Sequence, residues 1–303
     1  MAESANHEVS REQSEAFHRD GAVLLQGVLD GEWVERVKLG LNQVYAAPDV
    51  LSENLGTLRV DQFPASRSPH LQHLIEASPI AELVGSALRS PVRFYMDQSF
   101  VKPPGLFLPT PWHQDTCYYN LGGQDLIRAW ICCDPVPREM SLEVVRGSHH
   151  WNVTYSPLAG RDPDHDDTAR EQLDAAQQDR PMLGPEAYED WTYWSGVKDK
   201  RLPPVPDIEA NKDSFDILGW DYEPGDVILF HGHVLHAALG NVESAVPRRA
   251  HATLWAGRDV HYLHRVGQVI PDPIALYEHA PRSGQNLSEF PQVFPLAWSP
   301  EDC

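Results

Sequence analysis

His113 and Asp115 lie two residues apart in the segment PWHQDT. Side chains of an extended strand alternate between its two faces, so residues two apart point the same way. One imidazole and one carboxylate can then bind the same metal ion, and a second histidine would complete the 2-His-1-carboxylate triad of non-heme Fe(II) sites. The alternative is a buried hydrogen-bonded His–Asp pair without metal, so the interpretation depends on a distant histidine.

Further residues with suitable chemistry follow the apolar run DVILF. His231 and His233 alternate on one predicted strand face, so each is a candidate ligand or supporting residue beside His236. Arg248 and Arg249 open the next predicted strand. A guanidinium held inside a barrel needs an anionic partner, and the far carboxylate of a dicarboxylic acid suits its planar fork.

Taken together, these segments resemble the phytanoyl-CoA dioxygenase family of Fe(II)- and 2-oxoglutarate-dependent oxygenases. The likeness runs from about Phe17 to about Asp259. It is carried by VKPP at 101–104, WHQD at 112–115, AW at 129–130, LEVVRGSH at 142–149, HAALGN at 236–241 and RRA at 248–250. The combination is far more specific than the His-X-Asp pattern alone.

The resemblance implies roles for individual residues. The iron ligands it implies are His113, Asp115 and His236. The residues it places at 2-oxoglutarate are Arg248, Lys102 and Trp130. Two departures from the family pattern are the sequence EMS at 139–141, where relatives have an Asn-Gly turn, and a His236-to-Arg248 spacing one residue longer than usual. Arg249 therefore competes with Arg248, because a one-residue shift on a strand reverses which side chain points inward.

The fold implied by the resemblance is mainly β with flanking helices, built on a double-stranded β-helix or jelly roll. The implied function is hydroxylation of an unactivated C–H bond of a small organic molecule, with O2 as cosubstrate and succinate and CO2 as coproducts. Asp115 stands where related halogenases have a small residue, which disfavours halogenation. Alternatives are desaturation, cyclisation or epimerisation at the same iron, a non-catalytic jelly-roll binding protein, and a zinc or manganese cupin without 2-oxoglutarate.

The elements that must position these residues follow from local patterns. Helices are predicted from Ser10 to Gly21, from Asp30 onward, and over 69–77 and 79–88, on the basis of caps, prolines in the first turn and apolar spacing of three and four. Strands are predicted over 22–26, 92–102, 112–118, 125–133, 142–146, 226–231 and 249–255. Many short strands punctuated by Pro and Gly favour a sandwich or barrel.

We expect a single domain over 1–303, because no Gly/Ser-rich linker or charge block divides the chain. Residues 1–90 are predicted as mainly helical support, 91–155 and 215–262 as the jelly-roll core, and 263–303 as a C-terminal extension. Residues 156–214 form an insertion that could close over a pocket. Aromatic residues that could line an apolar pocket are Trp112, Tyr118, Tyr119, Trp151, Trp191, Tyr193 and Trp194.

The composition of the chain argues against several classes of binding partner. The net charge of −20 is spread along the chain, which argues against nucleic acid and anionic membranes and makes a CoA thioester less attractive than another small-molecule substrate. The four cysteines form no C-x-x-C pair, so neither a disulfide framework nor a thiolate zinc site is indicated. The polar N-terminus lacks a signal-peptide core and no long apolar span occurs, so we expect a cytoplasmic setting. The sequence does not reveal an oligomeric state.

Overall fold

The computed structural model describes residues 8–55, 58–107, 109–158, 164, 199–265, 273 and 281–300. Its helices are α1 (Arg11–Asp20), α2 (Gly31–Ala46), α3 (Pro69–Ala77) and α4 (Ile80–Leu88). Its strands are β1 (Ala22–Leu25), β2 (Ser52–Leu55), β3 (Leu58–Gln62), β4 (Val92–Lys102), β5 (Gly105–Phe107), β6 (Thr110–His113), β7 (Leu121–Gly122), β8 (Leu126–Cys132), β9 (Leu142–Val145), β10 (Ile217–Leu218), β11 (Val227–His231), β12 (His236–Ala238), β13 (Asn241–Ser244), β14 (Arg248–Ala256), β15 (His261–Tyr262) and β16 (Leu296–Trp298).

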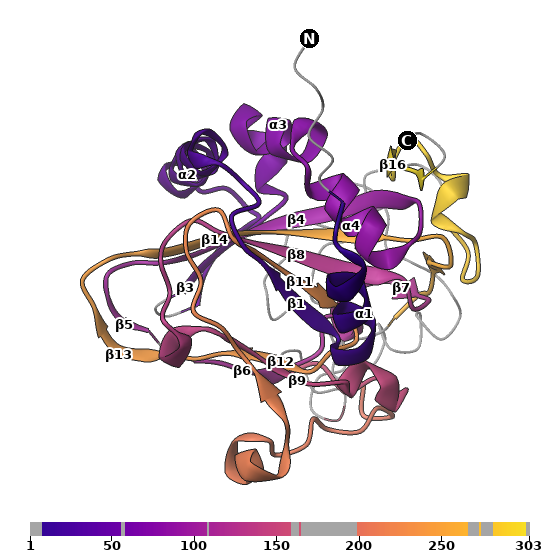
Figure 1. Cartoon of the computed structure of the whole chain (residues 1–303). Coiled ribbons are helices and arrows are strands. Elements are labelled where there is room, and N and C mark those ends of the chain that lie inside the picture. Colours follow the sequence, from indigo (N-terminus) through magenta and orange to yellow (C-terminus); the bar gives the residue numbers. More distant parts are fainter. Residues whose placement is uncertain are drawn as a thin grey trace.

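Two antiparallel sheets face each other and form the jelly roll. The major sheet has the strand order β1-β11-β8-β14-β4-β3-β2, and β16 pairs with the N-terminal end of β4. The minor sheet has the order β10-β9-β12-β6. Figure 1 shows α2 and α3 above the major sheet and strands β6, β9 and β12 of the minor sheet below it. The mainly β fold with flanking helices is therefore confirmed.

The two faces of the major sheet carry different side chains. Ile127, Ala129 and Ile131 of β8 point outward and join the buried residues of the four helices in one apolar core. The intervening residues of β8 point toward the minor sheet, where Cys132 packs with Val144 of β9 and Phe230 of β11. This alternation decides which residues can reach the space between the sheets.

The helices begin and end where local chemistry predicts. Ser10 and Gln13 form a reciprocal capping box at the start of α1, and Gly21 ends the helix with φ 83°. A Cβ atom on Gly21 would lie 2.6 Å from Nδ1 of His149, so this position needs glycine both for its backbone angle and for the close approach of a neighbour. Asp30 caps α2 by accepting from two backbone N–H groups.

Two parts of the sequence prediction were wrong in detail. The predicted strand 112–118 ends at His113, because the chain turns there into a 3-10 helix over Thr116–Tyr118 and Asp115 has a helical backbone (φ −75°, ψ −35°). The region before residue 91 supplies β2 and β3, which were not predicted, to the major sheet, whereas β1 lies at the predicted strand 22–26. Most of the 156–214 insertion, including Trp191, Tyr193 and Trp194, lies outside the described residues, as does much of the 263–303 extension.

Candidate metal and cosubstrate site

His113 and His236 are direct cross-strand partners on adjacent strands of the minor sheet. His113 closes β6, His236 opens β12, and their rings lie with centroids 4.2 Å apart on the face toward the major sheet. Asp115 reaches the same point from the turn after β6. The side-chain atoms of His113, Asp115 and His236 that could bind a metal all lie within 4.8 Å of one another.

The hydrogen bonds of both histidines leave the same ring nitrogen free. Nδ1 of His113 lies 2.8 Å from the Pro111 carbonyl oxygen, and Nδ1 of His236 lies 3.1 Å from the Val234 carbonyl oxygen. A carbonyl only accepts, so each Nδ1 carries the proton and each Nε2 presents a lone pair. Burial, with a smaller effect from His113, lowers the pKa of His236 to about 3 and keeps its ring neutral.

Asp115 uses its two carboxylate oxygens differently. Oδ1 lies 3.6 Å from Nε2 of His113 and 3.6 Å from Nε2 of His236, whereas Oδ2 lies 3.3 Å from Nε of Arg128. Burial alone would raise the pKa of this carboxyl, but the charge of Arg128, the largest opposing effect, holds it below its usual value. Two imidazoles that present Nε2 and one carboxylate are the donor set that suits Fe(II), so the residues present fit the metal.

Gln114, between the two predicted ligands, ties the site to distant segments. Its amide nitrogen donates to the carbonyl oxygens of Val153 at 3.0 Å and His233 at 2.8 Å, and its Oε1 accepts from the backbone N–H of Tyr155 at 3.0 Å. Its side chain is fully satisfied and buried. Gln114 therefore positions its neighbours and is not itself one of the candidate metal ligands.

Two cationic side chains face the space between the sheets. Arg248 and Lys102 are register partners on β14 and β4, and both are buried. Nη1 of Arg248 donates to the Met140 carbonyl oxygen at 2.5 Å and Nη2 to Oη of Tyr222 at 3.4 Å, and no carboxylate of the described residues lies within 4.0 Å of this guanidinium. Burial, followed by the charge of Arg248, lowers the pKa of Lys102 to about 7. A pair of buried cations favours an anionic ligand.

Arg249 has the opposite orientation. Its guanidinium donates to Asp134 at 2.6 and 3.0 Å on the helix-facing side of the sheet, and its backbone N–H donates to the same carboxylate at 2.8 Å. Trp130, in contrast, is on the inward face and its ring lies 4.9 Å from that of Phe100 on β4. Because side chains alternate along β14, Arg248 points between the sheets and Arg249 points toward the helices. Of the two arginines between which the sequence did not decide, only Arg248 faces the space beside the candidate metal site.

Comparison with known proteins now decides the family. The family model described as phytanoyl-CoA dioxygenase (PhyH) matches residues 17–250. The chain belongs to the phytanoyl-CoA dioxygenase family. It is accordingly an enzyme of the non-heme iron, 2-oxoglutarate-dependent oxygenase type, and its cofactors are Fe(II) and 2-oxoglutarate. No curated protein gave a significant match to the sequence.

Solved structures with the same fold include other iron enzymes. The non-heme alpha-ketoglutarate-dependent epimerase SnoN from nogalamycin biosynthesis is 20% identical, with a TM-score of 0.66 over 95% of this chain and 96% of that one. The carbocyclase SnoK from nogalamycin biosynthesis is 21% identical, with a TM-score of 0.59 over 85% and 88%. EctD from S. alaskensis, solved with 2-oxoglutarate and 5-hydroxyectoine, is 16% identical, with a TM-score of 0.59 over 93% and 88%. At these identities the likeness shows the fold.

The predicted aromatic residues of this phytanoyl-CoA dioxygenase family member do not all lie at the candidate metal site. Trp112 lies on the outer face of the minor sheet, where Nε1 donates to Glu209 at 3.1 Å, and Trp151 is exposed. Tyr118 lies with its ring centroid 6.1 Å from that of His113. Tyr119 is buried, and its hydroxyl accepts from Arg128. The described part of the site is therefore bounded by Tyr118 and Tyr119.

His231 and His233 belong to a separate cluster of histidines. The ring of His149 lies 3.8 Å from that of His150 and 4.9 Å from that of His231, and the rings of His231 and His233 lie 5.4 Å apart. Nε2 of His149 and Nε2 of His150 both donate to the carbonyl oxygen of His18 at the end of α1. This cluster connects α1 to the loop after β9 and the end of β11, and its members are not among the residues grouped with Asp115.

Lowering the pH is expected to destabilise the protein through this cluster. Burial lowers the pKa of His149 to about 4 and that of His231 well below its ordinary value, so the folded state holds both rings neutral. The unfolded chain binds these protons near pH 6.5, so the free energy of unfolding falls as the pH drops from about 6.5 toward 4, by up to about 1.4 kcal/mol per pH unit for each group. Urea titrations of the metal-free protein at several pH values measure this slope.

The matched variant is His149→Gln, whose amide nitrogen can still donate to the His18 carbonyl oxygen but cannot be protonated. Its stability should depend less steeply on pH than that of the wild type over the same range. Parallel curves for the two proteins would show that His149 does not contribute to the acid sensitivity.

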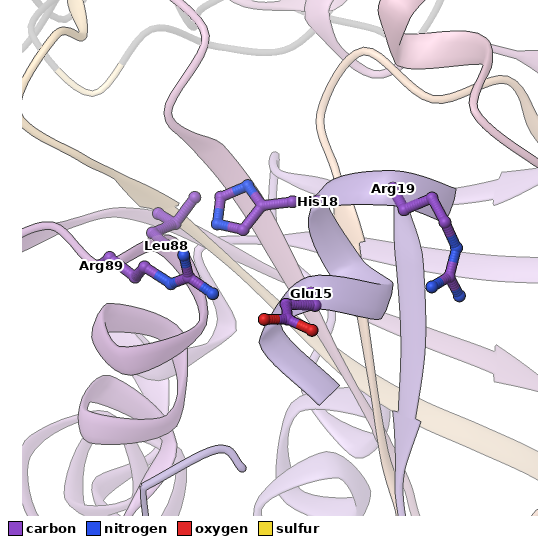
Figure 2. Close-up of a pocket in the computed structure, with 5 residues that line it drawn as sticks. All are labelled: Glu15, His18, Arg19, Leu88 and Arg89. Atoms are coloured by element: carbon purple, nitrogen blue, oxygen red, sulfur yellow. The ribbon is translucent and has the colours of Figure 1, made fainter. Parts of the chain in front are cut away.

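An open hollow on the surface contains none of the predicted site residues. It is lined by Glu15, His18 and Arg19 of α1 and by Leu88 and Arg89 at the end of α4 (Figure 2). Glu15 pairs with Arg11 at 2.7 Å, Arg19 pairs with Asp20 at 2.7 Å, and Figure 2 shows the Arg19 side chain directed away from Arg89. These exposed charges already have partners, so the hollow is not a candidate active site.

None of the helices in the described part of the chain has the length and apolar character that a membrane span requires.

Proposed function

We propose that the protein hydroxylates an unactivated C–H bond of a small organic molecule, using Fe(II) held by His113, Asp115 and His236. The observation that carries this proposal is the convergence of Nε2, Oδ1 and Nε2 of these residues on one point between the sheets. Fe(II) held by these residues would have positions left for 2-oxoglutarate and O2 and would supply the oxidising power, with succinate and CO2 as coproducts. The chain's own contribution is to position the ligands and to exclude water.

Arg248 and Lys102 are proposed to bind the distal carboxylate of 2-oxoglutarate. Arg248 has no carboxylate partner among the described residues, so its Nη atoms are free to exchange a carbonyl contact for a bidentate ion pair. Lys102 adds charge on the neighbouring strand, and an anion beside it would restore its protonation near neutral pH. Trp130 would form an inward-facing wall between these cations and Arg128, with which it shares β8.

The substrate is proposed to carry a neutral hydrogen-bonding group that contacts Gln62. This residue is the register partner of Gln98 on the inward face and is fully buried, yet neither its amide nitrogen nor its amide oxygen has a hydrogen-bond partner among the described residues. Unsatisfied buried amides are uncommon and costly, and an unmet donor beside an unmet acceptor matches an amide, a lactam or a hydroxyl of a ligand. The proposed substrate is therefore a polar small molecule.

Gln62→Leu is expected to raise the free energy of unfolding of the metal-free protein by about 1–3 kcal/mol, because it removes a buried amide without a partner. Gln98→Leu is the matched control. Gln98 accepts from Arg128, so its loss leaves a guanidinium N–H unsatisfied and should destabilise the protein. Thermal and urea unfolding of both variants measure the difference, and stability changes of the same sign would contradict the assignment of Gln62 as an unpaired ligand group.

The function itself is tested with purified protein, Fe(II), 2-oxoglutarate and a library of polar small molecules. Succinate release that depends on iron and rises with one library member identifies the substrate, and mass analysis of the product distinguishes the reactions. A gain of one oxygen atom supports hydroxylation. Loss of two hydrogens, or an isomer of unchanged mass, would instead assign desaturation, cyclisation or epimerisation, and absence of iron and 2-oxoglutarate binding would favour a binding protein.

A further inference from the structure

Arg128 is a buried charge in the middle of an apolar strand. Its neighbours Ile127 and Ala129 pack into the core beneath the helices, whereas Arg128 points between the sheets and is 3% exposed. A buried guanidinium costs several kcal/mol of desolvation unless it has an anionic partner and satisfied N–H groups. The only carboxylate of the described residues within 4.0 Å of it is Asp115.

The other two nitrogens of this guanidinium are fixed by neutral acceptors. Nη1 donates to Oη of Tyr119 at 2.5 Å, and Nη2 donates to Oε1 of Gln98. Gln98 of β4 contacts Arg128 diagonally across β14, where the register partner of Gln98 is the small Ala252 and that of Arg128 is Leu254. Tyr119 and Gln98 therefore set the direction of the Nε edge, which faces Oδ2 of Asp115.

The two oxygens of the Asp115 carboxylate therefore have different neighbours. Oδ1 is directed at both imidazoles, 3.6 Å from each Nε2, whereas Oδ2 forms an ion pair with Arg128, 3.3 Å from its Nε, and accepts no hydrogen bond from the described residues. A carboxylate held in this way gives one oxygen to a metal and not two. A metal with three protein donor atoms keeps three further positions, which is what a chelating keto acid and O2 together require.

We propose that Arg128 is a positioning residue that holds Asp115 as a one-oxygen ligand and so preserves the metal positions needed by 2-oxoglutarate and O2. The inference rests on the proposed iron site. It predicts opposite effects on two affinities when the guanidinium is removed, because Asp115 then regains both a free second oxygen and its full charge. The metal should bind at least as tightly, and 2-oxoglutarate should bind less tightly to the metal-loaded protein.

The test uses Co(II), which binds such sites without reacting and reports its coordination through visible absorption. In Arg128→Met, we expect the Co(II) dissociation constant to fall by about tenfold and the 2-oxoglutarate dissociation constant of the Co(II) protein to rise by about tenfold or more. Arg128→Lys retains the charge without the three-way contact and should lie between Met and wild type. Thermal unfolding of the metal-free variants identifies any that fails to fold, and the lysine variant then provides the comparison.

The outcomes separate the two proposals. Failure of the wild type to bind Co(II) would overturn the proposed metal site itself. Tight Co(II) and 2-oxoglutarate binding by the wild type, with both affinities weakened in parallel or both unchanged in the methionine and lysine variants, would leave the function standing and overturn the role of Arg128. A change of both affinities in opposite directions, with an altered Co(II) spectrum, would support it.

Discussion

His236→Ala is expected to abolish metal-dependent turnover, by at least about a thousandfold, because it removes one of three donor atoms from the proposed iron site. His236 is buried against Phe230, with ring centroids 4.7 Å apart, so the substitution also leaves a cavity in the space between the sheets. We therefore expect some loss of stability together with the loss of metal. Bound iron per chain and iron-dependent succinate release measure the two effects separately.

The matched control is His233→Ala, from the same histidine-rich segment. His233 lies outside the group around Asp115, and its Nε2 lies 3.0 Å from the Gly123 carbonyl oxygen. The control should retain full metal content and lose only the stability contributed by its hydrogen bonds, about 1 kcal/mol for each. If His233→Ala lost iron and His236→Ala retained it, the ligand assignment would be wrong.

Arg248→Ala should weaken 2-oxoglutarate binding by about a hundredfold, since removing one partner of a buried charge pair typically costs 2–5 kcal/mol. The residue faces inward beside Lys102, and the described residues place no carboxylate within 4.0 Å of it. Arg248→Lys should recover part of the affinity through its charge, but not the bidentate geometry. Titration of 2-oxoglutarate into the anaerobic Fe(II) protein, monitored by the visible charge-transfer band of a chelated keto acid, gives the dissociation constants.

Arg249→Ala provides the neighbouring control on the same strand. Its guanidinium is bound to Asp134, which raises its pKa, and the pair is mostly buried on the helix side. We expect the free energy of unfolding to fall by about 2 kcal/mol and the affinity for 2-oxoglutarate to be retained. Reversal of the two phenotypes would mean that the register of β14 differs from the one described.

The sequence was sufficient to predict the family, the mainly β fold and most of the core strands, because those conclusions depend on local patterns and motif segments. The capping box at Ser10 and the N-cap at Asp30 were correctly read from neighbouring residues alone. The strand hypothesis for His113 and Asp115 predicted their proximity for a reason that was only half correct. His113 is on a strand, but a turn delivers Asp115, and that turn depends on a hydrogen bond from Thr116 to Gly232, far away in the sequence.

Other features could not be predicted because their cause is non-local. Strand β3 reads as polar, but Asp61 is buried because Arg59 and Arg67 satisfy it on the helix side of the sheet. The neighbours of Gln62 and Arg128 are determined by the register between strands that are distant in the sequence, so the roles of these two residues could not be predicted from the residues beside them. An arginine inside the apolar run LIRAWIC was nevertheless a signal, since a charge at a core strand position requires a partner.

The pairing of β6 with β12 also has a consequence for how the enzyme matures. The site closes through contacts such as Gln114 to His233, separated by 119 residues, and the major sheet likewise joins strands that are not consecutive. Such high contact order makes folding slow, and the three donor atoms meet only after β6 has paired with β12. Metal therefore cannot guide the early steps of folding. It should instead extend the lifetime of the finished chain, since a ligand that binds only the native state lowers the population of unfolded molecules in proportion to its free concentration.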